Sequence, residues 1–407
     1  MRIGAMEETV VVSGASPIVD VQNVMQRHVV GSDLISTLPT ARSEFTMALL
    51  VPGMIIAGVS RPSGQDVGGS SAVAPHKLAI HGGKQGDSVE MLEGIPNNTM
   101  NGWSTSGVQM DAGALQEISF EMGAMSAESS TGGVRTNWIP KDGGNRFTGS
   151  LFGTYVSDKF QADDLSDDLI ARGLTSVNQM DRTWDSNESV GGPFKRDKLW
   201  FYFSQRNWGS YERVAGMYFD LNPTDYVFTP DLNHRAIDDF WQVSETLRLT
   251  WQATPKNKIA AFANQLNRCR CHNGVRANVS PEASTKSRHA AHLLQQVSWT
   301  SPLTSRVLLE VGVQNYHFDQ TTEPVAGITD DLLSVLEQST NVSFRAASNY
   351  GRHNDFSHNE RASLSYVTGS HAFKFGFTNQ HGARHQARMR PVREGSATPP
   401  TIVSPAC

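Results

Sequence analysis

The chain has 407 residues, of which 38% are hydrophobic and 18% are charged. This composition can supply one large or two ordinary hydrophobic cores, and it excludes a disordered protein. The chain has 35 Lys and Arg residues and 40 Asp and Glu residues, and no cluster of Lys and Arg is suited to binding a phosphate backbone. We therefore expect no nucleic-acid partner.

The N-terminal sequence MRIGAMEETVVV lacks the charged region, apolar core and cleavage site of a secretory signal. We therefore expect either a truncated start or a cytoplasmic protein. The stretch from Glu8 to Gly14 (ETVVVSG) carries β-favouring residues and suits an extended segment that another protein captures as an added strand. A buried strand would use the same valines.

The longest apolar stretch, Thr46 to Gly58, is interrupted by Pro52 and Gly53. It is also shorter than the roughly 20 residues of a membrane-spanning helix. We expect no such helix. Transmembrane β-strands remain open, because their lipid and lumen faces alternate and keep the average hydropathy low.

Up to about Asn145 the pattern predicts a compact α+β domain. The stretch from Asp33 to Leu50 places several apolar residues on one helical face. From Lys77 to Pro140 the sequence offers short strands between Gly-rich turns, in the order KLAI, SVEML, EISFEM and VRTNWI.

After Phe147 the pattern changes to a period of two. In Lys198 to Trp208 we expect Leu199, Phe201 and Phe203 to face lipid, and the opposite face to carry Trp200, Tyr202, Ser204 and Arg206. Three further hairpins are predicted, which pair Glu245 to Ala253 with Lys258 to Gln265, His292 to Thr300 with Arg306 to His317, and Arg361 to Val367 with Ala372 to Thr378.

The connections of these hairpins differ in length. Turns inside them are short, whereas the connections between them, roughly Gln161 to Asn187, Arg268 to Ser287 and Asp319 to Glu360, are long and polar. This asymmetry favours an outer-membrane β-barrel over a soluble β-sandwich.

Several motifs occur in an order that is typical of one protein family. Leu115 to Val156 contains an acidic strand, a Ser-Ala-Glu turn, Gly132 and Gly133, a strand that ends near Lys141, a Gly-Asn-Arg-Phe turn and an aromatic-rich strand. His81 to Asn98 contains Gly82, Gly83, Glu93 and Gly94, and Val190 to Arg206 (VGGPFKRDKLWFYFSQR) has the pattern of a hairpin. In this order the chain resembles TonB-dependent outer-membrane receptors, and the Oar-like branch most closely, over about residues 7 to 206.

The resemblance implies an α+β plug domain followed by antiparallel transmembrane β-barrel strands. We expect an N-terminal extended segment at residues 1–32, a plug at 33–145 and a partial outer-membrane barrel at 146–407. In the plug motif Glu93 stands where the family more commonly has an aspartate. Barrels of this family close with about 22 strands, but residues 147–407 hold only roughly eight to ten by the alternation rule, so we expect an incomplete barrel.

The resemblance also implies partners and a location. Residues Glu8, Thr9, Val10, Val11 and Val12 would form the TonB box, which the inner-membrane energising protein TonB captures. The other partners would be outer-membrane lipid and an unidentified extracellular ligand, and the protein would lie in the cell outer membrane. The missing signal and the abrupt end at TIVSPAC would then reflect a fragment cut at both ends.

Other chemistry is weakly supported. No P-loop, GxSxG or HExxH motif occurs, so we expect neither an enzyme nor a cofactor. Cys269, Cys271 and His272 lack further ligands at zinc spacing, which favours a loop disulfide or free thiols over a metal site. An extracellular adhesion or carbohydrate-binding β-protein remains the alternative function.

Two groups of side chains have spacings that could indicate a metal-binding site. The aspartates Asp163, Asp164, Asp167 and Asp168 lack the ligand order of an EF-hand, which favours a solvated acidic loop over calcium. The histidine pairs His289 with His292 and His381 with His385 have helix-like spacing, which does not bring strand residues together.

Overall fold

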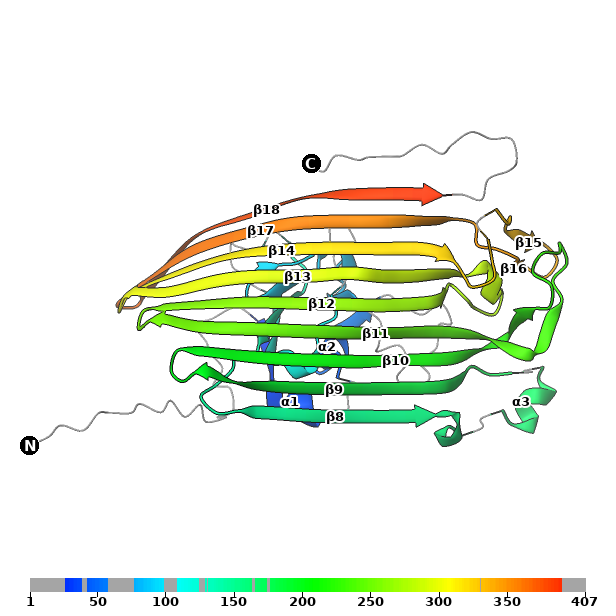
Figure 1. Cartoon of the computed structure of the whole chain (residues 1–407), viewed down its shortest axis with the longest axis horizontal. Helices are drawn as coiled ribbons and strands as arrows, with labels where there is room; N and C mark the ends of the chain where they lie inside the picture. Colours follow the sequence, from blue (N-terminus) through cyan, green and yellow to red (C-terminus); the bar gives the residue numbers. More distant parts are fainter. Residues whose placement is uncertain are drawn as a thin grey trace, which may run out of the picture.

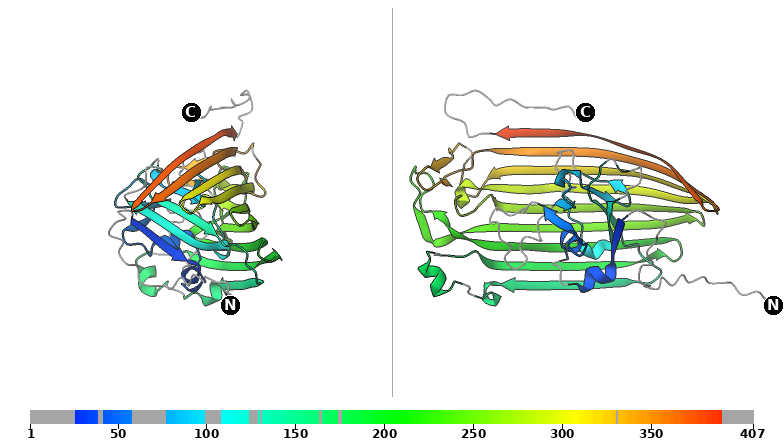
Figure 2. Two further views of the ribbon diagram at one scale, coloured as in Figure 1. Left: turned by 90° about the vertical axis from the view of Figure 1, so that its left-hand side faces the viewer. Right: turned by 180° about the vertical axis from the view of Figure 1, so that it is seen from behind.

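The computed structural model of the chain describes residues 26–38, 42–57, 77–98, 108–123, 129, 131–162, 165–173, 176–329 and 331–389. Two sheets dominate these residues. One has 5 strands in the order β1-β6-β7-β4-β5, and the other has 9 strands in the order β18-β17-β14-β13-β12-β11-β10-β9-β8. The small sheet lies on the concave side of the large one (Figure 1, Figure 2). We call the small sheet, together with a separate two-stranded sheet and the helices that precede β7, the plug, and we call the large sheet the wall.

The plug consists of short elements. Its strands are β1 (Gln26–Gly31), β2 (Met54–Ala57), β3 (Lys77–Ile80), β4 (Val89–Leu92), β5 (Ile95–Pro96), β6 (Leu115–Gly123) and β7 (Arg135–Pro140). Its helices are α1 (Ser32–Thr37) and α2 (Glu44–Ala48), with 3-10 turns η2 (Gln85–Asp87) and η3 (Ala112–Ala114). The four predicted plug strands are confirmed as β3, β4, β6 and β7. The prediction of one continuous helix from Asp33 to Leu50 is wrong, because the stretch contains two short helices, α1 and α2. Pro39 disfavours the helical conformation at the preceding residue, Leu38, and so ends α1.

The wall consists of long antiparallel strands. They are β8 (Thr148–Ser157), β9 (Gln179–Lys195), β10 (Leu199–Asp220), β11 (Pro230–Thr254), β12 (Asn257–Asn273), β13 (Thr285–Thr304), β14 (Val307–Pro324), β17 (Tyr350–Thr368) and β18 (His371–Met389). β8 and β18 are the two edges of this sheet, so the described wall is an open, incomplete barrel, as predicted.

Short elements cover the end of the wall at which the long connections lie. They are η4 (Asp158–Phe160), α3 (Asp167–Ala171), η5 (Pro281–Ala283), β15 (Val335–Glu337) and β16 (Val342–Phe344). We call this the long-loop end, and the opposite one the short-turn end. The strands reach further into the expected loops than predicted, since β12 continues to Asn273 and β14 to Pro324. None of the described helices has the length and apolar character needed to cross a membrane.

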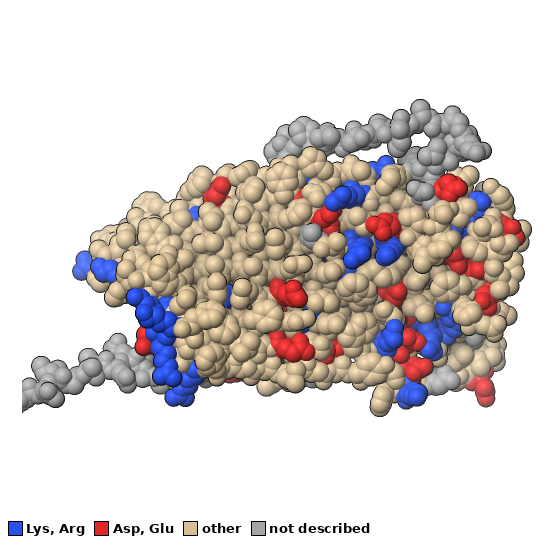
Figure 3. Space-filling model, in the orientation of Figure 1, with Lys and Arg blue, Asp and Glu red and all other residues tan. Residues whose placement is uncertain are grey.

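The two faces of the wall differ as predicted. Tyr202, Ser204 and Arg206 are buried on the concave face against the plug. On the convex face, Trp251 and Phe375 are exposed, and charged side chains are sparse over much of this face (Figure 3). The alternation therefore separates a side that lines a lumen from a side that suits lipid.

The plug and the wall share one hydrophobic core. Trp138 and Phe120 of the plug are fully buried. The same cluster includes wall residues from three neighbouring strands, namely Phe262, Leu294, Tyr316 and Phe318. The plug is therefore seated on the wall by packing as well as by the polar contacts described next.

Candidate plug-to-wall site

A buried arginine on the concave face binds two plug carboxylates. Arg248 of β11 donates from Nη2 to Glu93 Oε1 at 2.6 Å and from Nε to Asp142 Oδ1 at 2.5 Å. Thr250 Oγ1 and Lys258 Nζ also donate to Asp142, each at 2.7 Å. We call these residues, together with Gln296, which donates to Glu93 Oε2 at 3.1 Å, the Arg248 cluster.

The turn that presents Glu93 has an unusual backbone. Leu92 pairs with Ile95, and the two residues between them, Glu93 and Gly94, have φ angles of 49° and 79°. Two positive φ angles in a two-residue hairpin define a type I′ turn, which favours Asn-Gly or Asp-Gly. The turn is held by hydrogen bonds from Glu93 N to the Trp138 carbonyl at 3.0 Å and from Gly94 N to Asn137 Oδ1 at 2.8 Å. The longer carboxylate of Glu93 thereby reaches the wall.

The charges of the wall lower the pKa of Asp142. Burial alone would raise this pKa, but the Arg248 guanidinium and the Lys258 ammonium outweigh burial and lower it from 3.8 to about 2. The carboxylate is therefore ionised throughout the physiological pH range, and the ion pair persists there.

This shift predicts a pH dependence of plug attachment. Because the folded pKa lies below the unfolded one, Asp142 contributes stability that is fully present above about pH 4 and is lost as the pH falls toward about 2. In Asp142→Asn we expect a lower urea midpoint for plug unfolding at neutral pH, and a smaller fall between pH 4 and 2. An equal fall in both proteins would contradict the assignment.

A second polar cluster joins the plug to β9 and β10. Asn187 donates to Asp111 Oδ2 at 3.0 Å, and Ser204 also donates to this carboxylate. Arg42 donates to Asn187 Oδ1 at 2.8 Å. Arg206 binds Asp185 through two hydrogen bonds of 2.9 and 2.8 Å. Plug residues from two separate segments are thereby fixed to neighbouring wall strands.

Lys141 lies beside this second cluster. Its Nζ is 5.8 Å from the centre of the Tyr202 ring, and its backbone N–H donates to the Ala114 carbonyl at 2.8 Å. Burial lowers the pKa of Lys141. Tyr202 OH donates to the Gly113 carbonyl at 3.0 Å, so the end of the plug packs on the start of β10.

The residues predicted from the plug motifs are thus only partly brought together. Glu93 and Gly94 lie in the β4–β5 turn against Arg248 and Arg361. Gly82 and Gly83 lie in the turn after β3, and Gly132 and Gly133 precede β7. The predicted TonB box, Glu8 to Val12, lies outside the described residues. No sequence motif identified Arg248, Asp142 or Asp111 as contact residues.

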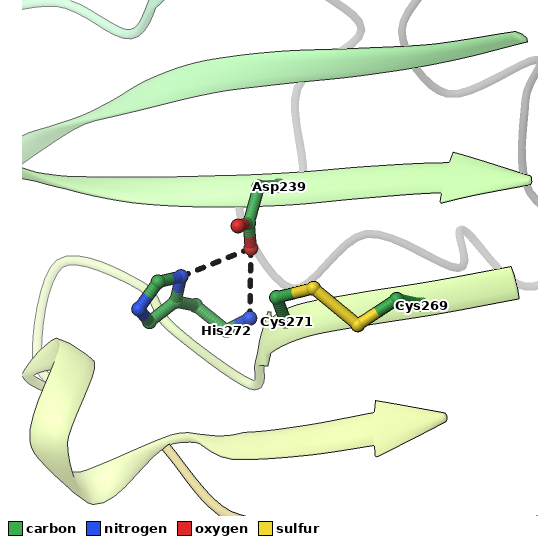
Figure 4. Close-up of a disulfide and its surroundings, with 4 residues drawn as sticks. All are labelled: Asp239, Cys269, Cys271 and His272. Carbon is green, nitrogen blue, oxygen red and sulfur yellow. Dashed lines mark hydrogen bonds and ion pairs between the residues drawn. A yellow bond between two sulfur atoms is a disulfide. The ribbon is translucent and has the colours of Figure 1, made fainter. Parts of the chain in front are cut away.

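Cys269 and Cys271 form a disulfide (Figure 4). Both lie within β12, so their expected position in a loop is wrong. The next residue, His272, contacts Asp239 of β11 through its backbone N–H at 2.8 Å and its Nδ1 at 3.0 Å. The disulfide lies within a single strand, whereas the contact between His272 and Asp239 joins β12 to β11 near the long-loop end.

The interpretation of His289 and His292 as non-converging is wrong. The register between β13 and β14 shifts between His289 and Ala291. This bulge turns both imidazoles to the concave face, where their ring centres are 5.8 Å apart. Among the described residues no group of three or more His, Cys, Asp and Glu side chains could hold a metal ion. Of the acidic loop, Asp163 and Asp164 lie outside those residues, and Asp167 and Asp168 begin α3.

A cavity of about 700 Å³ lies between the plug and β13, β14, β17 and β18. Polar and apolar surfaces contribute about equally to its lining, which includes the charged residues Arg27, Glu121 and Arg135 of the plug. The wall contributes Glu310 and Arg361. The interface between plug and wall is therefore packed on one side and open on the other.

Known proteins with this arrangement are outer-membrane transporters. The chain is 24% identical over 249 residues to the TonB-dependent transporter Oar of Myxococcus xanthus, which covers 58% of this chain and 20% of that protein. No profile of a known protein family matches the sequence.

Solved structures resemble the chain in fold. The outer-membrane transporter YddB of Escherichia coli superposes with a TM-score of 0.62 at 13% identity, over 89% of this chain and 49% of that one. The ferric yersiniabactin uptake receptor FyuA of Yersinia pestis superposes with a TM-score of 0.59 at 11% identity, over 91% and 50%. The chain thus spans about a fifth of the curated relative and half of the solved ones.

These similarities confirm the predicted resemblance to TonB-dependent outer-membrane receptors of the Oar type. They also confirm the fold class, an α+β plug with the strands of an incomplete barrel. The similar proteins are transporters and receptors rather than enzymes, and the predicted location, the cell outer membrane, agrees with theirs.

Proposed function

We propose that this chain is the plug and first part of the barrel of a TonB-dependent receptor that takes up an unidentified extracellular ligand. In this proposal the residues before β1 carry the TonB box, the plug begins with β1 (Gln26–Gly31) rather than at residue 33 and ends at residue 145, and residues 146–407 belong to the barrel. TonB captures Glu8 to Val12 as an added strand, and the outer-membrane lipid contacts the convex face of the wall.

The observation that carries the proposal is the seating of the plug on the concave face. A plug that blocks a lumen must be fixed at rest, and the Arg248 cluster and the second polar cluster, in which Asn187 binds Asp111, supply such fixed points. It must also yield to a pulling force, and the open cavity beside the Arg248 cluster leaves part of the plug-to-wall interface unpacked.

β1 is the plug element through which a force exerted by TonB would be transmitted. β1 lies at the edge of the plug sheet and pairs only with β6 among the described strands. In the sequence, β1 lies C-terminal to the proposed box. A force on β1 would act first on its hydrogen bonds with β6. The other neighbour of β6 is β7, so the plug sheet would be pulled apart from its β1 edge.

Deleting Glu8 to Gly14 tests the proposal. In the intact protein we expect the deletion to abolish retention of the purified periplasmic domain of TonB and to abolish energised uptake, while heat-modifiable gel mobility of the barrel stays unchanged. The matched variant Val11→Ile keeps the strand-forming character and should retain TonB. Full retention after the deletion would refute the box, and recovery of the protein in the soluble fraction without detergent would refute the barrel.

A further inference from the structure

Three long connections pack into one unit at the long-loop end. They follow β10, β12 and β14 and include residues 221–229, 274–284 and 331–349. Between the second and the third segment, Ser280 N donates to the Ser343 carbonyl and Ser343 N donates to the Asn278 carbonyl, each at 2.9 Å. We call these three segments the cover.

Side chains join the first segment of the cover to the third. The rings of Phe228 and Phe344 have centres 5.7 Å apart. Arg345 donates from Nε to the Thr224 carbonyl at 3.2 Å, and its guanidinium lies 4.2 Å from the centre of the Tyr226 ring. Because each segment contacts another, we expect the cover to move as one body.

A pair of buried carboxylates joins the cover to the wall. Glu282 of η5 accepts at Oε1 from the backbone N–H of Asp220, the last residue of β10, at 3.0 Å. Asp220 Oδ1 in turn accepts from the backbone N–H groups of Asn222 and Thr229, each at 3.2 Å. Asp220 is 7% exposed and Glu282 is 5% exposed. The second oxygen of each carboxylate, Asp220 Oδ2 and Glu282 Oε2, is buried without a hydrogen-bond partner among the described residues.

The carboxylate pair has no basic partner among the described residues. Besides the pair, the titratable groups on the elements that pack against η5 or adjoin it, near this end of the wall, are Tyr218 of β10, Arg276, Lys286 of β13 and Arg345 after β16. Arg276 donates to Asn278 Oδ1 at 3.1 Å, and Lys286 lies opposite Glu323 in the register of β13 and β14. Two ionised carboxylates in such a site would repel each other, because neither a cation nor water offsets their charge.

From these contacts we infer that Asp220 and Glu282 form a pH-sensitive latch that holds the cover on the wall. One proton, taken from the solvent and bound by the pair, leaves a single negative charge and keeps η5 on the end of β10. When this proton returns to the solvent, the two charges repel and the cover separates from β10. The inference goes beyond the proposed function, because the latch acts on the long connections and not on the plug.

The position of the pair exposes it to the pH of the medium. β10 has 22 residues, whereas a strand crosses the bilayer with about 9 to 11. Asp220 is the last of these residues at the long-loop end, so the pair lies outside the membrane-spanning part of the wall.

The direction of the pH response follows from Glu282. Burial raises the pKa of Glu282, and the negative charge of Asp220 raises it further, against the opposing effect of hydrogen bonds from backbone N–H groups and Ser280. Because the folded pKa lies above the ordinary value of 4.5, the protonated carboxyl contributes stability that is fully present below about pH 4.5. This stability is lost as the pH rises through the folded pKa. We therefore expect the cover to be closed in acid and to open toward alkaline pH.

The test is hydrogen exchange of the amides of residues 277–284 in the intact protein in detergent, from about pH 5 to about pH 9. Each rate is divided by the rate of Glu282→Gln at the same pH, which cancels the chemical pH dependence of exchange. Glutamine keeps an acceptor for Asp220 N but carries no charge. We expect the ratio to rise about tenfold or more over this range, which corresponds to a pKa raised by one unit. The matched control is Glu337→Gln on β15, where Glu337 is exposed and accepts from Ser339 and Thr340, and it should respond to pH like the wild type.

A second variant and a cation control complete the experiment. Asp220→Asn removes the other charge, should exchange like Glu282→Gln, and carries the test if Glu282→Gln does not fold by heat-modifiable gel mobility. A ratio that stays constant from about pH 5 to about pH 9 would overturn the latch. Calcium chloride that restores slow exchange to the wild type at about pH 9 would assign the pair to a cation and would also overturn it. None of these results bears on capture by TonB, which the deletion of Glu8 to Gly14 addresses separately.

Discussion

Replacing Arg248 by Met is expected to loosen the plug by about 3 kcal/mol, because two plug carboxylates lose their buried partner. The Arg248 side chain is 5% exposed, whereas those of Glu93 and Asp142 are 21% and 34% exposed. Methionine keeps the length and the apolar stem but provides no donor. The carboxylates of Glu93 and Asp142 would then face each other across the former position of the guanidinium. Their mutual repulsion would replace the attraction of each carboxylate to Arg248.

Hydrogen exchange of the plug amides in the intact protein measures this effect. A loss of about 3 kcal/mol corresponds to an acceleration of roughly a hundredfold for amides that exchange when the plug leaves the wall. The control is Lys258→Met, which removes a second cation from Asp142. Its side chain is 43% exposed, so we expect less than about 1 kcal/mol. Equal acceleration in both variants would show that net charge, and not the buried contact, holds the plug.

The plug strands could be predicted because their limits are set by local turn chemistry. Gly-rich turns flank KLAI and VRTNWI, and both became strands close to the expected residues. The wall strands were recognised where hydrophobic and polar residues alternate. They were too short in the prediction because alternation fades toward the long-loop end, where β11 already begins at Pro230 and carries Asp238 and Asp239 on opposite faces.

The polar contacts between plug and wall could not be deduced in the same way. A period of two is enough to place Arg248 on the polar face of its strand, but its partner Glu93 is 155 residues away in the sequence. Such a pairing depends on how the plug is rotated inside the lumen. The convergence of His289 and His292 depends on a bulge that no residue pattern marked.

Replacing Gly133 by Ala is expected to destabilise the plug by about 3 kcal/mol, because a methyl group would collide with backbone atoms. A Cβ at Gly133 would lie 2.3 Å from the carbonyl carbon and oxygen of Asp87 and 2.8 Å from Ser88 N. Flexible side chains can move away from a new methyl group, but the backbone of Asp87 and Ser88 is fixed by hydrogen bonds. Val89 N donates to the Val134 carbonyl at 2.8 Å, and Thr131 Oγ1 donates to the Asp87 carbonyl at 2.7 Å.

The adjacent glycine supplies the control. A Cβ at Gly132 would have no atom within 4 Å, so Gly132→Ala should change the stability by less than about 1 kcal/mol, with a small gain from the stiffer unfolded chain. Urea unfolding of the intact protein, followed by proteolysis of the released plug, measures both variants. If the two alanines lowered the midpoint equally, the Gly-Gly pair would act through chain flexibility. If only Gly133→Ala lowers the midpoint, the glycine is required because the segments that lead into β4 and β7 approach closely. The parallel pairing of these two strands keeps the Glu93 turn directed at Arg248.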